Sequence, residues 1–101
     1  RAVNRRVEWT KRAKGSLDIY CDQIAEESPS SAIKVRREIV LTARTLSKNA
    51  TFYQIDEYYP DNRGDIRRFF RWDYRVVYQV REEKVVILNV YHTSRHPDNL
   101  K

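Results

Sequence analysis

The spacing of hydrophobic and polar residues changes along the chain, and each spacing predicts a different element. Residues 3–9 alternate with a period of two, which is typical of a strand with one buried face. Residues 13–24 repeat at helical spacing, and Thr10 is a suitable N-cap for this helix. We therefore expect a strand followed directly by an amphipathic helix. The apolar face of the helix consists of Ala13, Leu17, Tyr20, Cys21 and Ile24.

A second helix is predicted after Ser28-Pro29, which interrupts the first. Ser28 can cap it, and Pro29 suits the first helical position because a missing N–H costs nothing there. The link is very short, so the two helices should form an antiparallel hairpin. The polar side of the second helix carries Arg36, Arg37 and Arg44, and its apolar stripe consists of Ala32, Val35, Ile39, Thr42 and Leu46.

The segment from Ser47 to Asp65 has no regular period, which indicates a long connection. We expect a short extended piece over Phe52–Ile55 and a turn over Asp61–Asp65, where Asp, Asn and Gly favour reversal. Three strands follow, separated by tight turns at Asp73 and at Glu82-Glu83. Links this short force antiparallel neighbours. The predicted strands are Ile66–Trp72, Tyr74–Arg81 and Lys84–Tyr91.

The predicted fold class is α+β, with an N-terminal strand, an antiparallel helix hairpin and a three-strand antiparallel meander. The helices should pack on one face of the sheet. A length of 101 residues supports a single domain over residues 1–101 with one modest core. Cys21 shares a helix face with Leu17 and is expected to be a buried, inert thiol. Large aromatic side chains should add to the core, namely Trp9, Tyr20, Phe70 and Trp72.

Composition narrows the classes of function. The chain has 20 Lys and Arg residues against 14 Asp and Glu, and its net charge of +6 favours an anionic partner, either nucleic acid or an acidic protein. A single cysteine cannot form an internal disulfide, so a reducing, cytoplasmic setting is expected. No stretch approaches the roughly 18 apolar residues of a membrane span, and no signal peptide is visible.

The stretch VVILNVYHTSRHP, residues 85–97, runs from an apolar strand straight into a polar cluster. RNA cleavage by its own 2′-OH needs proton carriers and cations that stabilise the developing charge on the phosphate. Histidine titrates near neutral pH, arginine binds phosphate bidentately, and tyrosine stacks on bases. The alternative is a polar end to a strand. The candidates are His92 and His96 for proton transfer, Arg71, Arg75 and Arg95 for phosphate, and Tyr74 and Tyr91 for stacking.

The expected turn at residues 82–83 sets the pairing of the last two strands. Paired positions would sum to 165, so Arg75 would face Val90, with His92 within two residues. Arg95 could reach this point from the tail. We therefore predict that Arg75, His92 and Arg95 converge as a candidate catalytic set. The alternative is a structural role, in which Arg75 forms an ion pair with Asp73 or Glu82.

Three stretches in this order give the chain a family resemblance: WTKRAKGSLDIYCDQIAEESPSSA, IRRFFRWDYRVVYQV and VVILNVYHTSRHP. Over Val7–Pro97 the sequence resembles the RelE/ParE superfamily of toxins from bacterial type II toxin–antitoxin systems, which include plasmid stabilisation systems. The resemblance implies a helix hairpin packed on an antiparallel sheet, in agreement with the elements predicted above. It also implies a cognate antitoxin protein as partner.

The resemblance implies two activities. One branch cleaves mRNA on the ribosome without a metal, using an arginine of the Tyr-Arg strand and a basic residue after the last strand, which Arg75 and Arg95 match. That branch usually carries a Tyr or His near its C-terminus, and no tyrosine follows Arg95 here. The other branch, the ParE type, binds DNA gyrase. We expect a ParE-type toxin without metal or cofactor; the alternatives are a ribosome-dependent mRNA endonuclease and a non-toxic basic RNA-binding domain.

Overall fold

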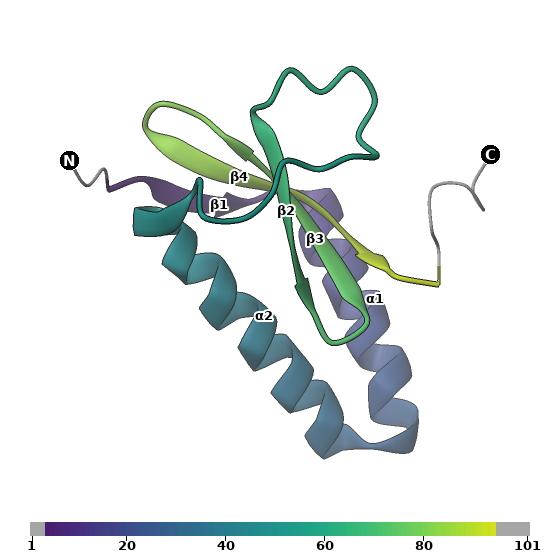
Figure 1. The fold of residues 1–101 in the computed structure, drawn as a ribbon. Helices are drawn as coiled ribbons and strands as arrows, with labels where there is room; N and C mark the ends of the chain where they lie inside the picture. Colours follow the sequence, from purple (N-terminus) through teal and green to yellow (C-terminus); the bar gives the residue numbers. More distant parts are fainter. Residues whose placement is uncertain (1–3, 95–101) are drawn as a thin grey trace.

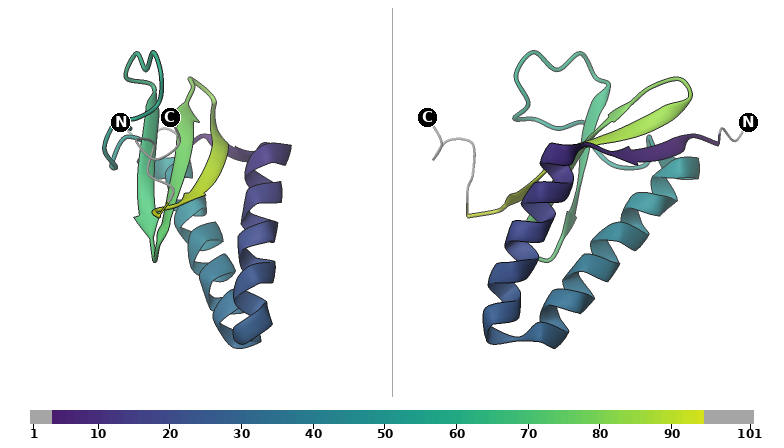
Figure 2. Two further views of the ribbon diagram at one scale, coloured as in Figure 1. Left: turned by 90° about the vertical axis from the view of Figure 1, so that its right-hand side faces the viewer. Right: turned by 180° about the vertical axis from the view of Figure 1, so that it is seen from behind.

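The computed structural model describes residues 4–94 and has two layers, a helix hairpin and a four-stranded sheet (Figure 1). The strand order is β1-β4-β3-β2, and both helices lie on the same face of the sheet (Figure 2). The predicted α+β fold is therefore confirmed. The elements are β1 (Arg6–Trp9), α1 (Lys11–Glu27), α2 (Pro29–Asn49), β2 (Ile66–Arg71), β3 (Tyr74–Val80) and β4 (Lys84–His92).

Strand β1 is the parallel neighbour of β4, with Arg6 opposite Lys84 and Trp9 opposite Ile87. The chain leaves β1 through Thr10, whose hydroxyl donates to the Ile87 carbonyl at 2.9 Å and accepts the Ala13 N–H at 3.1 Å. One side chain thus joins the sheet to the first turn of α1 and satisfies a helix N–H that has no intrahelical partner.

The hairpin follows the predicted apolar stripes. Ser28 ends α1 and caps α2, accepting the Ser31 N–H at 3.3 Å, and Pro29 is the first residue of α2. Helix α2 continues to Asn49, slightly beyond the predicted end. Residues at helical spacing face the sheet because i, i+3 and i+4 positions share one side of a helix. The buried residues of the two stripes are Ala13, Leu17, Cys21, Ala32, Val35, Ile39, Thr42, Ala43 and Leu46.

The sheet contributes the other half of the core through the face that the helices cover. The phenol of Tyr78 is fully buried and donates to the Ala50 carbonyl at 2.9 Å. Burial raises the pKa of Tyr78, so this hydroxyl stays protonated as a donor. The strand residues of this core include Phe69, Tyr74, Val76, Tyr78, Val85, Ile87 and Val90.

Two of the four aromatic residues expected in the core are exposed instead. Phe70 is 43% exposed because it lies opposite Arg75, on the sheet face away from the helices. Trp72 is 53% exposed and lies in the β2–β3 turn with a positive φ of 53°, a conformation that usually favours glycine. The prediction of a buried role was therefore wrong for both, whereas Trp9 and Tyr20 pack against the core.

The connection between α2 and β2 continues the sheet by a single bridge, in which Ile55 pairs with Arg67. The expected turn forms around Asn62, whose side-chain oxygen accepts the N–H groups of Gly64 at 2.8 Å and Ile66 at 3.2 Å. Gly64 has a φ of 100°, which an L side chain rarely adopts. None of the helices in residues 4–94 is long and apolar enough to cross a bilayer.

Candidate functional site

Arg75 lies on the sheet face that the helices leave uncovered, which we call the outer face. Its guanidinium donates to the Asp56 carboxylate at 2.9 Å and lies 5.3 Å and 4.8 Å from the ring centroids of Tyr58 and Tyr91. The side chain of Asp56 is 0% exposed and that of Arg75 is 10% exposed. The cation is therefore buried, paired and enclosed by aromatic rings. Its carboxylate comes from the connection, not from the strand turns that the sequence suggested.

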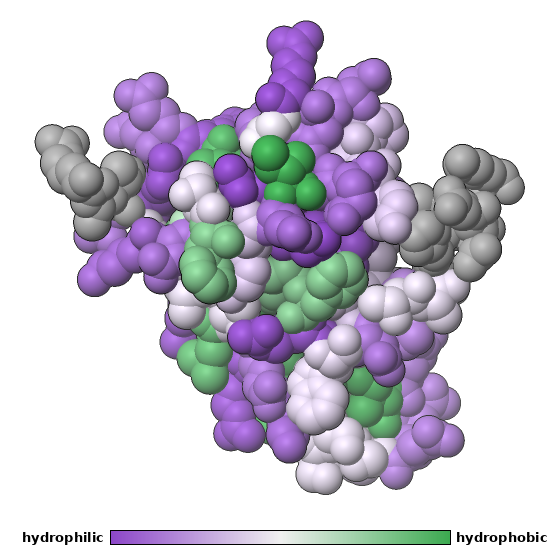
Figure 3. All heavy atoms as spheres, viewed as in Figure 1, coloured by the Kyte–Doolittle hydropathy of each residue, from purple (hydrophilic) through white to green (hydrophobic). Residues whose placement is uncertain are grey.

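Arg68 also forms an ion pair and hydrogen bonds with residues of the connection between α2 and β2. It donates to both carboxylate oxygens of Glu57, at 3.0 and 2.9 Å, and to the side chain of Gln54 at 2.7 Å, while its guanidinium covers the ring of Phe70. These hydrogen bonds hold the pKa of Glu57 below its usual range. Hydrophobic and hydrophilic side chains consequently interleave on the outer face (Figure 3).

The pairing of β3 with β4 differs from the predicted register by one residue at Arg75. Positions sum to 165 only from Tyr78 to Val80; a bulge between Val77 and Tyr78 then leaves Leu88 unpaired, and Arg75 faces Tyr91 instead of Val90. Next to the unpaired Leu88, the side-chain oxygen of Asn89 accepts a hydrogen bond from the Ser16 hydroxyl of α1 at 2.7 Å. A bulge inserts one residue into a strand and shifts every pair beyond it.

His92 lies on the opposite face of the sheet from Arg75. It pairs with Tyr74, its ring is 5.2 Å from the ring of Tyr74, and its backbone N–H donates to the Tyr20 hydroxyl of α1 at 3.2 Å. The Ser94 N–H donates to His92 Nδ1 at 3.0 Å, so in the neutral ring the proton is on Nε2. The predicted convergence of Arg75 and His92 does not occur, because neighbouring positions on a strand point to opposite faces.

The other candidate residues divide between the two faces. Tyr91 joins Arg75 on the outer face, whereas Tyr74 is buried beside Tyr20, and burial raises the pKa of the Tyr74 phenol. Arg71 pairs with Tyr74 at the end of β2 and donates to the Phe70 carbonyl at 3.0 Å. The last two candidates, Arg95 and His96, lie outside the described residues.

Sequence reasoning missed Asp56 and Tyr58, the two residues that enclose Arg75 from the connection. Their segment mixes carboxylates and tyrosines without a period, so it gave no signal for which residue faces the sheet. The backbone N–H of Asp56 donates to the Ile66 carbonyl at 2.9 Å, and this bond brings the carboxylate over β3. The sequence held one indication that a carboxylate of this segment could pair with Arg75: the segment directly precedes an arginine-rich strand.

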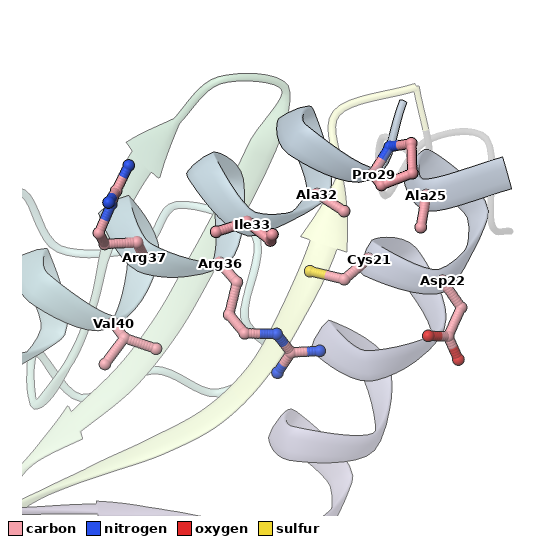
Figure 4. A pocket seen from close by; sticks show the side chains of 9 residues that line it. All are labelled: Cys21, Asp22, Ala25, Pro29, Ala32, Ile33, Arg36, Arg37 and Val40. Carbon is pink, nitrogen blue, oxygen red and sulfur yellow. The ribbon is translucent and has the colours of Figure 1, made fainter. Parts of the chain in front are cut away.

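A second feature is a groove along the helix hairpin (Figure 4). A cavity of about 530 Å³ near the Ser28 turn and one of about 220 Å³ near Trp9 share Arg36 and Val40 in their walls. Cys21 borders the larger cavity, and burial raises the pKa of its thiol, so it is protonated and weakly reactive. Within residues 4–94, no three His, Cys, Asp or Glu side chains gather as metal ligands. The larger cavity is lined by Cys21, Asp22, Ala25, Pro29, Ala32, Ile33, Arg36, Arg37 and Val40.

Comparison with known proteins defines the class as a toxin of a type II toxin–antitoxin system. The family model described as ParE toxin of type II toxin–antitoxin system, parDE, matches residues 7–97. The chain therefore belongs to the ParE toxin family, within the superfamily that the sequence resembles. Among curated proteins, no sequence matches the chain.

Two solved structures share this fold. The chromosomal ParDE toxin–antitoxin system from P. aeruginosa contains a chain with a TM-score of 0.71 and 22% identity, covering 87% of this chain and 95% of that one. The toxin–antitoxin complex RelBE2 from Mycobacterium tuberculosis gives a TM-score of 0.57 and 21% identity, covering 89% and 92% of the two chains. At these identities the likeness is one of fold.

Proposed function

We propose that the protein is a toxin that acts in the cytoplasm by binding a protein target such as DNA gyrase. The supporting observation is the separation of Arg75, paired with Asp56, from His92 on the other sheet face. A nuclease needs its cation and its proton carrier at the same phosphate. A toxin that acts by binding a protein does not need these two groups to lie together. Membership of the ParE family supports the same choice.

Pulsed expression of the wild type and of His92→Gln tests this proposal. We expect both proteins to arrest growth and induce DNA-damage signalling while mRNA half-lives stay unchanged, because binding requires no proton carrier. Arg95→Ala should reduce toxicity whichever target is right, because an acidic patch on a protein and a phosphate both need a cation. The measurements are growth, a DNA-damage reporter and mRNA decay after transcription is blocked.

Circular dichroism of each variant provides the folding control for that experiment. Global shortening of mRNA half-lives by the wild type, abolished in a folded His92→Gln variant, would contradict the gyrase-type proposal. That result would instead support the ribosome-dependent mRNA endonuclease.

The groove of the hairpin supports a second part of the proposal, neutralisation by a cognate antitoxin. Its floor is apolar, with Ala32 and Val40 among the lining residues. Within residues 4–94, its walls carry the unpaired cations Lys14 and Arg37, the ion-paired Arg36 and one carboxylate, Asp22. Such a groove suits an amphipathic helix whose apolar face is flanked by acidic residues. We propose that an acidic antitoxin segment occupies it.

Two exposed isoleucines of the hairpin allow a matched test. Ile33 borders the groove and is 64% exposed, whereas Ile19 is 59% exposed and borders another surface. Ile33→Asp should weaken binding of the antitoxin encoded beside this gene by at least about tenfold, because it adds a like charge and removes apolar contact. Ile19→Asp should bind normally. Equal affinities by calorimetry would exclude the groove as the docking site.

A further inference from the structure

We propose that the open end of the helix hairpin, where α1 begins and α2 ends, binds the phosphate backbone of duplex DNA. This inference does not depend on the toxin's target, and its surface shares only Lys14 with the groove proposed for the antitoxin. We call this surface the basic end. Its residues are Lys11, Arg12 and Lys14 of α1 and Arg44 and Lys48 of α2.

The five cations of the basic end have no side-chain partner within the described part of the chain, residues 4–94. Three arginines elsewhere are neutralised: Arg36 pairs with Asp18, Arg68 with Glu57 and Arg75 with Asp56. Lys11, Arg12 and Lys14 are exposed, as are Arg44 and Lys48. Within the described residues, five of the exposed cations of the hairpin without an ion pair therefore lie at one end, while Lys34, which covers the Trp72 ring, and Arg37 lie toward the Ser28 turn.

Helix stability does not account for the cations in α1. The N-terminus of a helix carries partial positive charge, so cations there are unfavourable and acidic residues favourable. Yet Lys11 and Arg12 are the first two residues of α1, and its first turn contains no acidic residue. An anionic ligand that binds these side chains would offset this repulsion. Ligand binding therefore explains the two cations, which helix stability does not.

The residues on either side of β1, Arg5 and Thr10, connect the two helix ends at this end of the molecule. The Arg5 N–H donates to the Ser47 carbonyl of α2 at 2.9 Å, and Thr10 caps α1 at the other end of the strand. Figure 2 shows β1 between the first turn of α1 and the last turns of α2, with the Ser28 turn at the far end of the hairpin. The acidic residues of α1 lie toward that far end: Asp18, Asp22, Glu26 and Glu27.

The chemistry of the basic end favours a duplex over a single strand or a protein. Single-strand binding uses a series of aromatic platforms on which successive bases stack. Residues 4–18 hold no exposed aromatic side chain, and on the α2 side Phe52, 77% exposed, packs edge-on against the ring of Tyr53. On the outer face, where aromatics are exposed, Arg68 and Arg75 are already paired with carboxylates. Protein interfaces are depleted in lysine at their cores. Five unpaired cations with one exposed aromatic side chain nearby fit a sugar–phosphate backbone, which needs only cations, better than a row of stacked bases.

Fluorescence anisotropy with the purified full chain and a labelled DNA duplex of about 20 base pairs tests the proposal. If all five cations engage phosphates, log K should fall with log salt with a slope of about −4.5. K11Q/R12Q and R44Q/K48Q should each weaken binding by more than about tenfold at roughly 0.1 M salt and reduce the slope by about 2. K34Q/R63Q removes the same charge away from the basic end and should bind nearly as the wild type does.

Thermal melts by circular dichroism verify that each variant is folded. The proposal is overturned if K34Q/R63Q loses as much affinity as the other two variants, because net charge alone would then explain binding. It is equally overturned if single-stranded RNA or polyglutamate binds more tightly than the duplex.

Discussion

Arg75→Met is expected to lower the free energy of unfolding by about 3–5 kcal/mol, because it leaves a buried carboxylate without its cation. Asp56 is 0% exposed at its side chain, and its carboxylate accepts hydrogen bonds from Arg75 at 2.9 Å and from the Tyr58 N–H at 3.2 Å. The methionine keeps much of the apolar contact of Arg75 with the tyrosine rings. Urea unfolding measures the change through the midpoint at constant slope.

Two further variants make this prediction specific. Arg75→Met/Asp56→Leu should recover most of the loss, because replacing both partners leaves no buried charge unpaired. Arg36→Met breaks an ion pair of the same length, 2.9 Å, between half-exposed side chains, and should cost under about 1 kcal/mol. Similar losses for Arg75→Met and Arg36→Met would contradict the buried pair. A loss of this size would by itself reduce the toxicity of an Arg75 variant. Reduced toxicity is therefore evidence of a functional site only if the variant is shown to be folded.

Leu17→Ala and Ile39→Ala should each lower the free energy of unfolding by about 2–5 kcal/mol. Leu17 is 3% exposed and Ile39 is fully buried between the hairpin and the sheet, so truncation leaves a cavity as well as losing apolar burial. The same urea titration measures both variants.

Leu41→Ala provides the matched control on α2, because Leu41 is 48% exposed and loses little burial when truncated. Arg37→Ala, on the polar side, should change the free energy of unfolding by no more than about 0.5 kcal/mol. If all four variants unfold at the same urea concentration, the orientation of the hairpin against the sheet is wrong.

The hairpin could be predicted from the sequence because its determinants are local. Thr10 and Ser28 cap helices through bonds to residues three positions along the chain. The apolar stripes repeat at i, i+3 and i+4, so the spacing alone identifies the buried side of each helix. Tight turns likewise determined the antiparallel order of β2, β3 and β4, since links of two and three residues permit no other neighbours.

The candidate site could be predicted only in part. Alternation in β2 separates Phe69 from Phe70, but it does not say which of the two the helices cover. The bulge moves Arg75 from Val90 to Tyr91, and beside it Asn89 accepts a hydrogen bond from Ser16, a contact between residues 73 positions apart. No pattern in either strand encodes that contact.

The sequence by itself determined the helix caps, the two buried stripes, the meander and the excess of cations, because each depends on neighbours in the chain or on composition. Only the tertiary structure decided that β1 lies parallel to β4, that Asp56 neutralises Arg75, and that His92 faces the helices. These arrangements arise when distant segments compete for the same buried space. Which segments end up together depends on which partner best satisfies a buried charge or a buried hydrogen-bonding group. Only the packing in three dimensions determines that partner.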